Sequence, residues 1–143
     1  MPHVAFVPMS GFRIREQEML ALGMSLPGLQ ARQRAVGQLP ALGLLTLAGM
    51  LPDEWSCNHH AAEPVPDDLV HALVCERPDL VAISALTASI HEAYELTRRL
   101  RAEGLPTVIG GLHATACPDE EIAQGATVVS GSAEWVWLTL LHD

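Results

Sequence analysis

The chain has 143 residues, a length that suits a single domain whose core is large enough to fold without disulfides or a structural metal. Acidic residues outnumber basic ones by 17 to 8, and the formal net charge of −9 argues against nucleic acid or an anionic membrane as a partner. The cysteines number three, and neither a secretory signal nor an apolar run long enough to span a membrane is visible. We therefore expect free thiols and a cytoplasmic protein, with one domain over residues 1–143.

The first predicted elements are a strand, a long irregular segment and an apolar helix. A short apolar run from His3 to Pro8 predicts a buried strand. The segment from Met9 to Leu39 has little regular pattern and is predicted to be a long loop or insertion. Ala41 to Leu51 carries no charge and follows Pro40, a residue that suits the first turn of a helix. A helix that is apolar all round is expected to be buried on most sides.

The next segment, Glu54 to His60, is predicted to be an edge strand. Its Cys57, His59 and His60 are residue types found in metal sites, but alternating polar side chains on an edge strand explain them better because no fourth ligand is in sight. Helices and strands then alternate to the end of the chain. The predicted elements are a helix from Pro66 to about Cys75, a strand from Leu80 to Ser84, a helix from Ser89 to about Glu103, a strand from Pro106 to Ile109, a short helix from Pro118 to Ala123, a strand from Thr127 to Ser130 and a helix from Ala133 to Leu141.

Continuous apolar strands that alternate with helices are typical of a parallel sheet covered on both faces. Five such strands joined by right-handed crossovers predict an α/β, flavodoxin-like (Rossmann-like), doubly wound domain with strand order 2-1-3-4-5. In this architecture ligands bind outside the carboxyl ends of the strands, near the point where the strand order reverses. The residues that directly follow the strands are therefore the candidates for a binding site.

Small residues, hydroxyls and glycines follow the predicted strands. Glycine has no Cβ atom to keep a ligand away from the backbone, so this lining favours a large flat or elongated ligand, and its lack of charge argues against a triphosphate. The sequence has neither a P-loop nor a dinucleotide-binding glycine motif, and neither catalytic residues nor metal ligands are predicted. The candidate ligand-binding residues are Ser10, Gly11, Ser84, Leu86, Thr87, Gly110, Gly111, Leu112, His113, Gly131 and Ser132.

Four segments occur in an order and at a spacing that together are distinctive: "LPALGLLTLAGML", "PDLVAISALT", "VIGGLHATACPDEE" and "VVSGSAEWVWLTLL". The set resembles the N-terminal cobalamin-binding domain of cobalamin-dependent radical S-adenosylmethionine enzymes, over about Val4 to Leu141. Ser132-Ala133 departs from the family pattern, which has an acid-containing pair before Glu134. The resemblance implies that cobalamin is the cofactor and that its nucleotide tail lies beside Gly110 and Gly111. On that basis, Gly111→Val is expected to abolish corrinoid binding while the domain stays folded.

The resemblance also implies a barrel domain that holds an iron–sulfur cluster and binds S-adenosylmethionine. The chain has no C-x-x-x-C-x-x-C motif for such a cluster, so we expect a fragment of a longer protein or a chain that works with a separate barrel partner. In either case it is expected to be the cofactor domain of a radical S-adenosylmethionine methyltransferase or related enzyme, and not to catalyse a reaction alone. The alternative is a stand-alone flavodoxin-like module that binds a nucleotide or a protein.

The lower axial ligand of the cobalt is a separate question. Many cobalamin-binding domains of this architecture carry D-x-H-x-x-G after the first strand, and that histidine replaces the cofactor's own base on cobalt. No such motif occurs here, where Met9-Ser10-Gly11-Phe12 follows the first strand. His113 follows the fourth strand and is expected to make a hydrogen bond instead of reaching cobalt, because the orienting aspartate of the motif is missing. We therefore expect cobalamin to bind base-off and without a histidine ligand.

Overall fold

The computed structural model describes residues 1–9, 41–60 and 67–142. The predictions for Ser10, Gly11 and the rest of the long segment up to Leu39 lie outside these described residues. Five parallel strands form one sheet in the order β2-β1-β3-β4-β5, which confirms the predicted doubly wound topology. The strands are β1 (His3–Met9), β2 (Ser56–His59), β3 (Leu80–Ala85), β4 (Thr107–Gly110) and β5 (Thr127–Val129).

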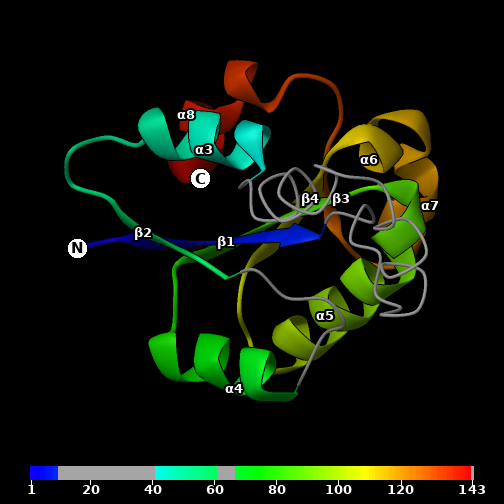
Figure 1. The fold of residues 1–143 in the computed structure, drawn as a ribbon, viewed down its shortest axis with the longest axis horizontal. Coiled ribbons are helices and arrows are strands. Elements are labelled where there is room, and N and C mark those ends of the chain that lie inside the picture. The colour runs from blue at the N-terminus through cyan, green and yellow to red at the C-terminus, as the bar shows by residue number, and fades with distance from the viewer. Residues whose placement is uncertain (10–40, 61–66, 143) are drawn as a thin grey trace, which may run out of the picture.

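Helices cover both faces of the sheet, with α3 and α8 on one side and α4 and α5 on the other (Figure 1). The helices are α3 (Leu42–Gly49), α4 (Asp67–Glu76), α5 (Ile90–Ala102), α6 (Leu112–Ala116), α7 (Pro118–Ala123) and α8 (Trp137–His142), with short 3-10 turns η1 (Thr87–Ser89) and η2 (Ala133–Trp135). Two of these differ from the sequence prediction. The short helix α6 was not predicted, and the predicted last helix is broken at Val136 into η2 and α8.

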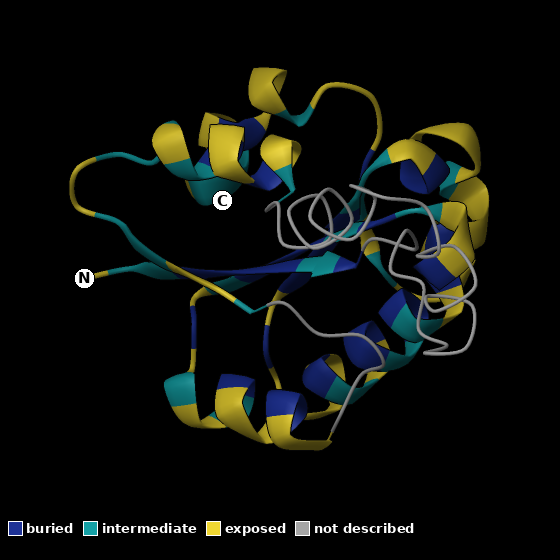
Figure 2. Ribbon diagram, in the orientation of Figure 1, coloured by how far each residue is buried: buried dark blue, intermediate teal, exposed yellow. Residues whose placement is uncertain are grey.

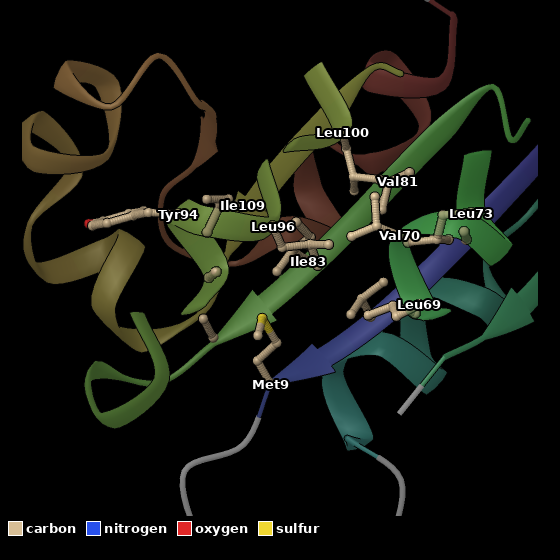
Figure 3. Close-up of a cluster of buried hydrophobic side chains, with 14 of the residues drawn as sticks. Met9, Leu69, Val70, Leu73, Val81, Ile83, Tyr94, Leu96, Leu100 and Ile109 are labelled. Carbon is tan, nitrogen blue, oxygen red and sulfur yellow. The ribbon is translucent and has the colours of Figure 1, made fainter. Parts of the chain in front are cut away.

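The interior strand β1 shows why the sheet needs cover on both faces. Successive side chains of a strand point to opposite faces, and Val4, Ala5, Phe6 and Val7 are all fully buried. Val4 and Phe6 belong to the core beneath α3 and α8, whereas Ala5 and Val7 belong to the core on the side of α4 and α5. Figure 3 shows this second core, in which side chains of α4 and α5 pack on those of β1, β3 and β4.

The prediction that the apolar helix α3 is buried on most sides is wrong. Leu44 and Leu47 are buried against the sheet, but Leu42 is 78% exposed and Leu45 is 40% exposed. The helix lies as a single layer over the sheet, and Figure 2 shows its outer side exposed. Its hydrophobic composition therefore leaves an apolar outer face.

The edge strand β2 and the residue after it carry Cys57, His59 and His60, which are residue types that often bind metals. β2 pairs with β1 alone, as predicted for an edge strand. The two histidines at its end face different partners: His59 stacks on Phe6 with ring centroids 5.1 Å apart, and His60 Nε2 lies 2.8 Å from a carboxylate oxygen of Glu76.

Among the described residues, no helix is both long and apolar enough to cross a membrane.

Candidate functional site

A cavity of about 300 Å³ opens at the carboxyl ends of β3, β4 and β5, on the face covered by α3 and α8. This is the edge at which ligands bind in doubly wound sheets, and the volume is at the lower end of the range for small-molecule sites. Of the predicted binding residues, those that line the cavity are Ser84, Gly110, Gly111, Leu112, Gly131 and Ser132.

The other described candidates lie outside the cavity lining. Leu86 and Thr87 follow β3 at the start of η1, and His113 lies in α6 with its ring buried against Thr87. Their place next to the strand ends is as expected, but the chain turns into η1 and α6 and carries their side chains away from the cavity. Whether any of the candidates touches a ligand stays a prediction.

The apolar wall of the cavity was missed by the sequence reading. It is formed by Leu44 and Leu47 of α3, by Val129 at the end of β5 and by Trp137 of α8. These residues come from helix sides and from within a strand, so a search limited to residues after strands does not find them. The sequence predicted α3 to be an apolar helix, and this composition was the available sign that one of its sides lines the cavity.

Thr115 connects the loop after β4 to the loop after β5 by hydrogen bonds. Its hydroxyl donates a 2.9 Å hydrogen bond to the carbonyl of Gly111 one turn earlier in α6. The same oxygen accepts a 2.9 Å hydrogen bond from the backbone N–H of Gly131, which follows β5. Gly131 has a φ of +81°, a conformation that glycine adopts without strain. The loop after β4 and the loop after β5 are therefore held at a fixed distance across the mouth.

The two consecutive glycines have different roles. A Cβ atom on Gly111 would lie 2.6 Å from the carbonyl oxygen of Ala85, and Gly111 has a φ of +116° and a ψ of −169°. A side chain at this position is excluded by the neighbouring strand and by the backbone conformation. A Cβ on Gly110 would meet only Val129, at 3.6 Å and beyond, which is ordinary contact. The structure therefore argues against the expectation that Gly111→Val leaves the domain folded, and Gly110 is the position at which a side chain can be added with ordinary contacts.

His113 is a buried residue that contacts a small polar cluster beside the cavity. Its Nδ1 lies 3.2 Å from the hydroxyl of Thr87, so the predicted hydrogen-bonding role agrees with the geometry. Its Nε2 lies 3.7 Å from a carboxylate oxygen of Glu120. The other oxygen of Glu120 accepts a 3.2 Å hydrogen bond from the hydroxyl of Tyr94. Burial and the nearby charge of Glu120 raise the pKa of Tyr94, so its hydroxyl stays protonated and remains a donor.

The chemistry of the lining limits what the cavity accepts. Apolar side chains form most of the wall, hydroxyls of Ser84, Thr115 and Ser132 supply hydrogen bonds, and Glu134 is the single charged residue lining it in the described part of the chain. An acid at the mouth disfavours phosphate-rich ligands, because like charges repel. The walls suit an uncharged, partly aromatic group with a few polar atoms.

An all-parallel sheet of this order, with a hollow at the carboxyl ends of three strands, defines a doubly wound small-molecule-binding domain. Sequence comparison gives the family directly. The chain belongs to the B12-binding domain family, whose pattern matches residues 31–138. The resemblance to cobalamin-binding domains is thereby confirmed.

Several curated proteins are similar to the chain. Two come from Chlorobaculum tepidum. Bacteriochlorophyllide d C-8(2)-methyltransferase is 38% identical over 65 residues, which are 46% of this chain and 14% of that protein. Bacteriochlorophyllide d C-12(1)-methyltransferase is 31% identical over 98 residues, which are 68% of this chain and 20% of that protein. Hopanoid C-2 methylase of Rhodopseudomonas palustris is 32% identical over 84 residues, which are 57% and 15%. The chain thus spans a fifth or less of the length of these relatives.

Proposed function

We propose that this chain binds cobalamin as the cofactor domain of a methyltransferase, with the nucleotide tail of the cofactor in the cavity between the sheet and helices α3 and α8. The observation that carries the proposal is the position and lining of this cavity, in a chain of the B12-binding domain family. When bound, cobalamin supplies a cobalt centre that accepts and releases a methyl group. The chain's own residues bind, orient and shield that cofactor.

Each part of the cavity has a distinct task in this proposal. Leu44, Leu47, Val129 and Trp137 exclude water and pack against the aromatic base of the tail. Burying such apolar surface contributes about 25 cal/mol per Å². The hydroxyls of Ser84 and Ser132 offer hydrogen bonds to the polar atoms of the tail. The hydroxyl of Thr115 donates its proton to Gly111 and can only accept a further hydrogen bond.

Gly110 has the task of keeping the floor of the cavity open. It lies at the end of β4 opposite Val129 of β5, with which it is paired in the sheet. Both residues line the cavity, and no side chain of Gly110 occupies it. The absence of a Cβ at this position lets a ligand reach the backbone of the strand.

Filling the cavity from within is expected to weaken cobalamin binding. In a Ser84→Leu variant the larger side chain occupies space that is empty in the folded chain, so we expect the domain to stay folded and the affinity to fall at least about tenfold, or about 1.4 kcal/mol. Titration with hydroxocobalamin, followed by visible absorbance, measures this. Thr127→Leu is the control, because it also replaces a hydroxyl-bearing residue by leucine, at an exposed position on β5 that does not line the cavity. Equal affinities for the two variants would contradict the proposed location of the tail.

We further propose that cobalamin binds with its own base displaced and with no protein histidine on cobalt. The sequence has no D-x-H-x-x-G motif. His113 is the histidine nearest to the cavity among the candidates, but its ring is engaged with Thr87 and faces Glu120, and it does not line the cavity. Leu86 and Leu112 are the apolar side chains that we place at the lower face of the corrin.

Electron paramagnetic resonance of bound cob(II)alamin is the measurement that tests the axial ligand. A spectrum without nitrogen superhyperfine splitting is expected, because neither the displaced base nor a histidine is coordinated. Splitting that disappears in a His113→Ala variant would identify His113 as the ligand and contradict the proposal. Splitting that persists in that variant would instead show that the cofactor's own base or another histidine remains on cobalt.

The full enzyme is proposed to be of the radical S-adenosylmethionine type. The relatives that the chain resembles are named methyltransferases or a methylase, and each is several times longer than this chain. We place the iron–sulfur cluster and S-adenosylmethionine in a barrel domain that works with this domain, in the same chain or as a partner. The alternative of a nucleotide-binding module has less support, because the chain belongs to the B12-binding domain family.

A further inference from the structure

A second candidate site lies outside the cavity, where α6 meets α7. His113 of α6, Cys117 between the two helices and Glu120 of α7 each offer one potential metal-ligand atom, and these atoms all lie within 4.8 Å of one another. An ion placed between three such atoms lies at most about 2.8 Å from each of them. Small rotations of the side chains then give the bonds of about 2.0–2.3 Å that Zn²⁺ makes with nitrogen, oxygen and sulfur. No metal ligands were predicted from the sequence, because no local pattern places Glu120 beside Cys117 and His113.

The position and burial of His113 suit it to act as a metal ligand. Its side chain is only 9% exposed, and its Nε2 atom is buried without a hydrogen-bond partner among the described residues. Its Nδ1 contacts the Thr87 hydroxyl at 3.2 Å. In the tautomer in which Nδ1–H donates to Thr87, Nε2 carries a lone pair directed away from that contact. A metal-binding imidazole is typically oriented by such a hydrogen bond from its other nitrogen.

The carboxylate of the cluster is oriented in the same way. One oxygen of Glu120 accepts the hydrogen bond from Tyr94, and the other lies 3.7 Å from His113 Nε2. That separation is too long for a hydrogen bond. It is close to the roughly 3.4 Å that separates two ligands bound at about 2.1 Å to one tetrahedral ion. The geometry suits two ligands that share an ion better than it suits a direct hydrogen bond.

The unsatisfied nitrogen of His113 also favours a cation. His113 Nε2 is buried without a hydrogen-bond partner in the described part of the chain, and leaving such an atom unsatisfied costs about 1–3 kcal/mol. A divalent cation would satisfy this nitrogen directly and would attract the carboxylate of Glu120, which lies 3.7 Å away.

We propose that His113, Cys117 and Glu120 form a binding site for one divalent metal ion of the zinc class, with water at the exposed fourth position. Mixed nitrogen, sulfur and carboxylate ligands are those that zinc accepts. The site is separate from the proposed cobalamin cavity, because none of the three ligands lines that cavity. The metal site and the cavity are neighbours, because α6 carries both His113 and Thr115, and Thr115 lines the cavity. An ion in this site would fix α6 against α7 and against the loop after β3.

Cobalt(II) is the probe that tests this site. It is added to the chain purified free of cobalamin, whose own absorbance would otherwise mask the signal. We expect near-ultraviolet thiolate-to-cobalt absorption that saturates at one equivalent and is removed by added Zn²⁺. Cys117→Ser is expected to abolish that absorption and to weaken zinc affinity at least tenfold by calorimetry. Glu120→Gln is expected to weaken zinc binding while the thiolate absorption persists at saturating cobalt.

The matched control is Cys75→Ser. Cys75 is also an exposed cysteine near a histidine, with its sulfur 3.6 Å from His71 Nδ1, but it has no third ligand beside it in the described part of the chain. This variant is expected to bind cobalt and zinc like the wild type. The proposal is overturned if the wild type shows no thiolate absorption and no zinc binding, or if the absorption survives Cys117→Ser and is lost in Cys75→Ser. Circular dichroism of each variant establishes that it is folded.

Discussion

A Gly111→Ala variant is expected to lose about 2–5 kcal/mol of unfolding free energy. Two destabilising effects add up. The backbone conformation at Gly111 is one that residues with a side chain rarely adopt, and adopting it costs about 1–3 kcal/mol. The new methyl group would also lie 2.6 Å from the carbonyl oxygen of Ala85. Forcing an atom into a packed region adds about 1–3 kcal/mol. Urea denaturation followed by circular dichroism measures the loss.

Gly110→Ala is the matched control for this prediction. The two glycines are adjacent, but a methyl group at Gly110 makes only ordinary contacts with Val129, and the backbone there is not left-handed. Its unfolding free energy is expected to stay within about 1 kcal/mol of the wild type. A Gly111→Ala variant as stable as Gly110→Ala would show that the close approach of the loop to β3 is not as the structure has it. The comparison also decides which glycine is useful for mutating the cavity: only the Gly110 variant separates folding from binding.

A Glu76→Gln variant is expected to lose about 2–3 kcal/mol at pH 7. Glu76 is the last residue of α4, and its side chain is only 17% exposed. One of its carboxylate oxygens contacts His3 at 2.5 Å and Asn58 at 2.7 Å. The other oxygen contacts His60 at 2.8 Å. Hydrogen bonds to a charged group contribute about 1.5–3 kcal/mol each when made, less when partly replaced by an amide. Chemical denaturation at pH 7 measures the difference. The control is Glu95→Gln, which removes an exposed pair with Arg98 and is expected to cost less than about 0.5 kcal/mol.

The same variant has a defined pH dependence. Burial alone would raise the pKa of Glu76, but the hydrogen bonds from His3 and Asn58 and the charge and hydrogen bond of His60 hold it below its ordinary value of 4.5. The unfolded chain therefore binds the proton more readily than the folded chain, and the contribution of Glu76 is present above about pH 4.5 and is lost as the pH falls through the lower folded value. The stability difference between wild type and Glu76→Gln should shrink on acidification. A difference that grows as the pH falls from 5 to 3 would contradict this sign.

Strand order and most element boundaries were predictable because they depend on local pattern. Apolar runs such as Leu80 to Ser84, separated by helical segments, leave few ways to build a parallel sheet, and the observed β3 differs from that prediction by one residue. The helix from Pro118 to Ala123 begins and ends where the proline and the acidic first turn predicted. Trp135 and Trp137 lie two residues apart but differ in exposure, with the first 88% exposed and the second 2% exposed.

The site was only partly predictable, because its lining depends on contacts between distant segments. The residues after the strands follow from topology, and six of the nine described candidates line the cavity. The wall formed by Leu44 and Trp137 depends on how α3 and α8 pack over the sheet, which no local pattern reports. The cluster of His113, Cys117 and Glu120 depends on the unpredicted helix α6, which turns His113 away from the cavity and towards Glu120.

The cavity walls come from widely separated parts of the chain: Leu44 and Leu47 stand near its beginning and Trp137 near residue 143, with β3 to β5 between them. Trp137 also packs against Phe6 of β1, with the two rings tilted and their centroids 5.8 Å apart. Such a hollow exists only when the whole domain is assembled, so any ligand that fills it selects the folded state. By mass action, a ligand present at one hundred times its dissociation constant adds about 2.7 kcal/mol to the unfolding free energy. The domain is thus expected to unfold less readily when the cavity is filled than when it is empty.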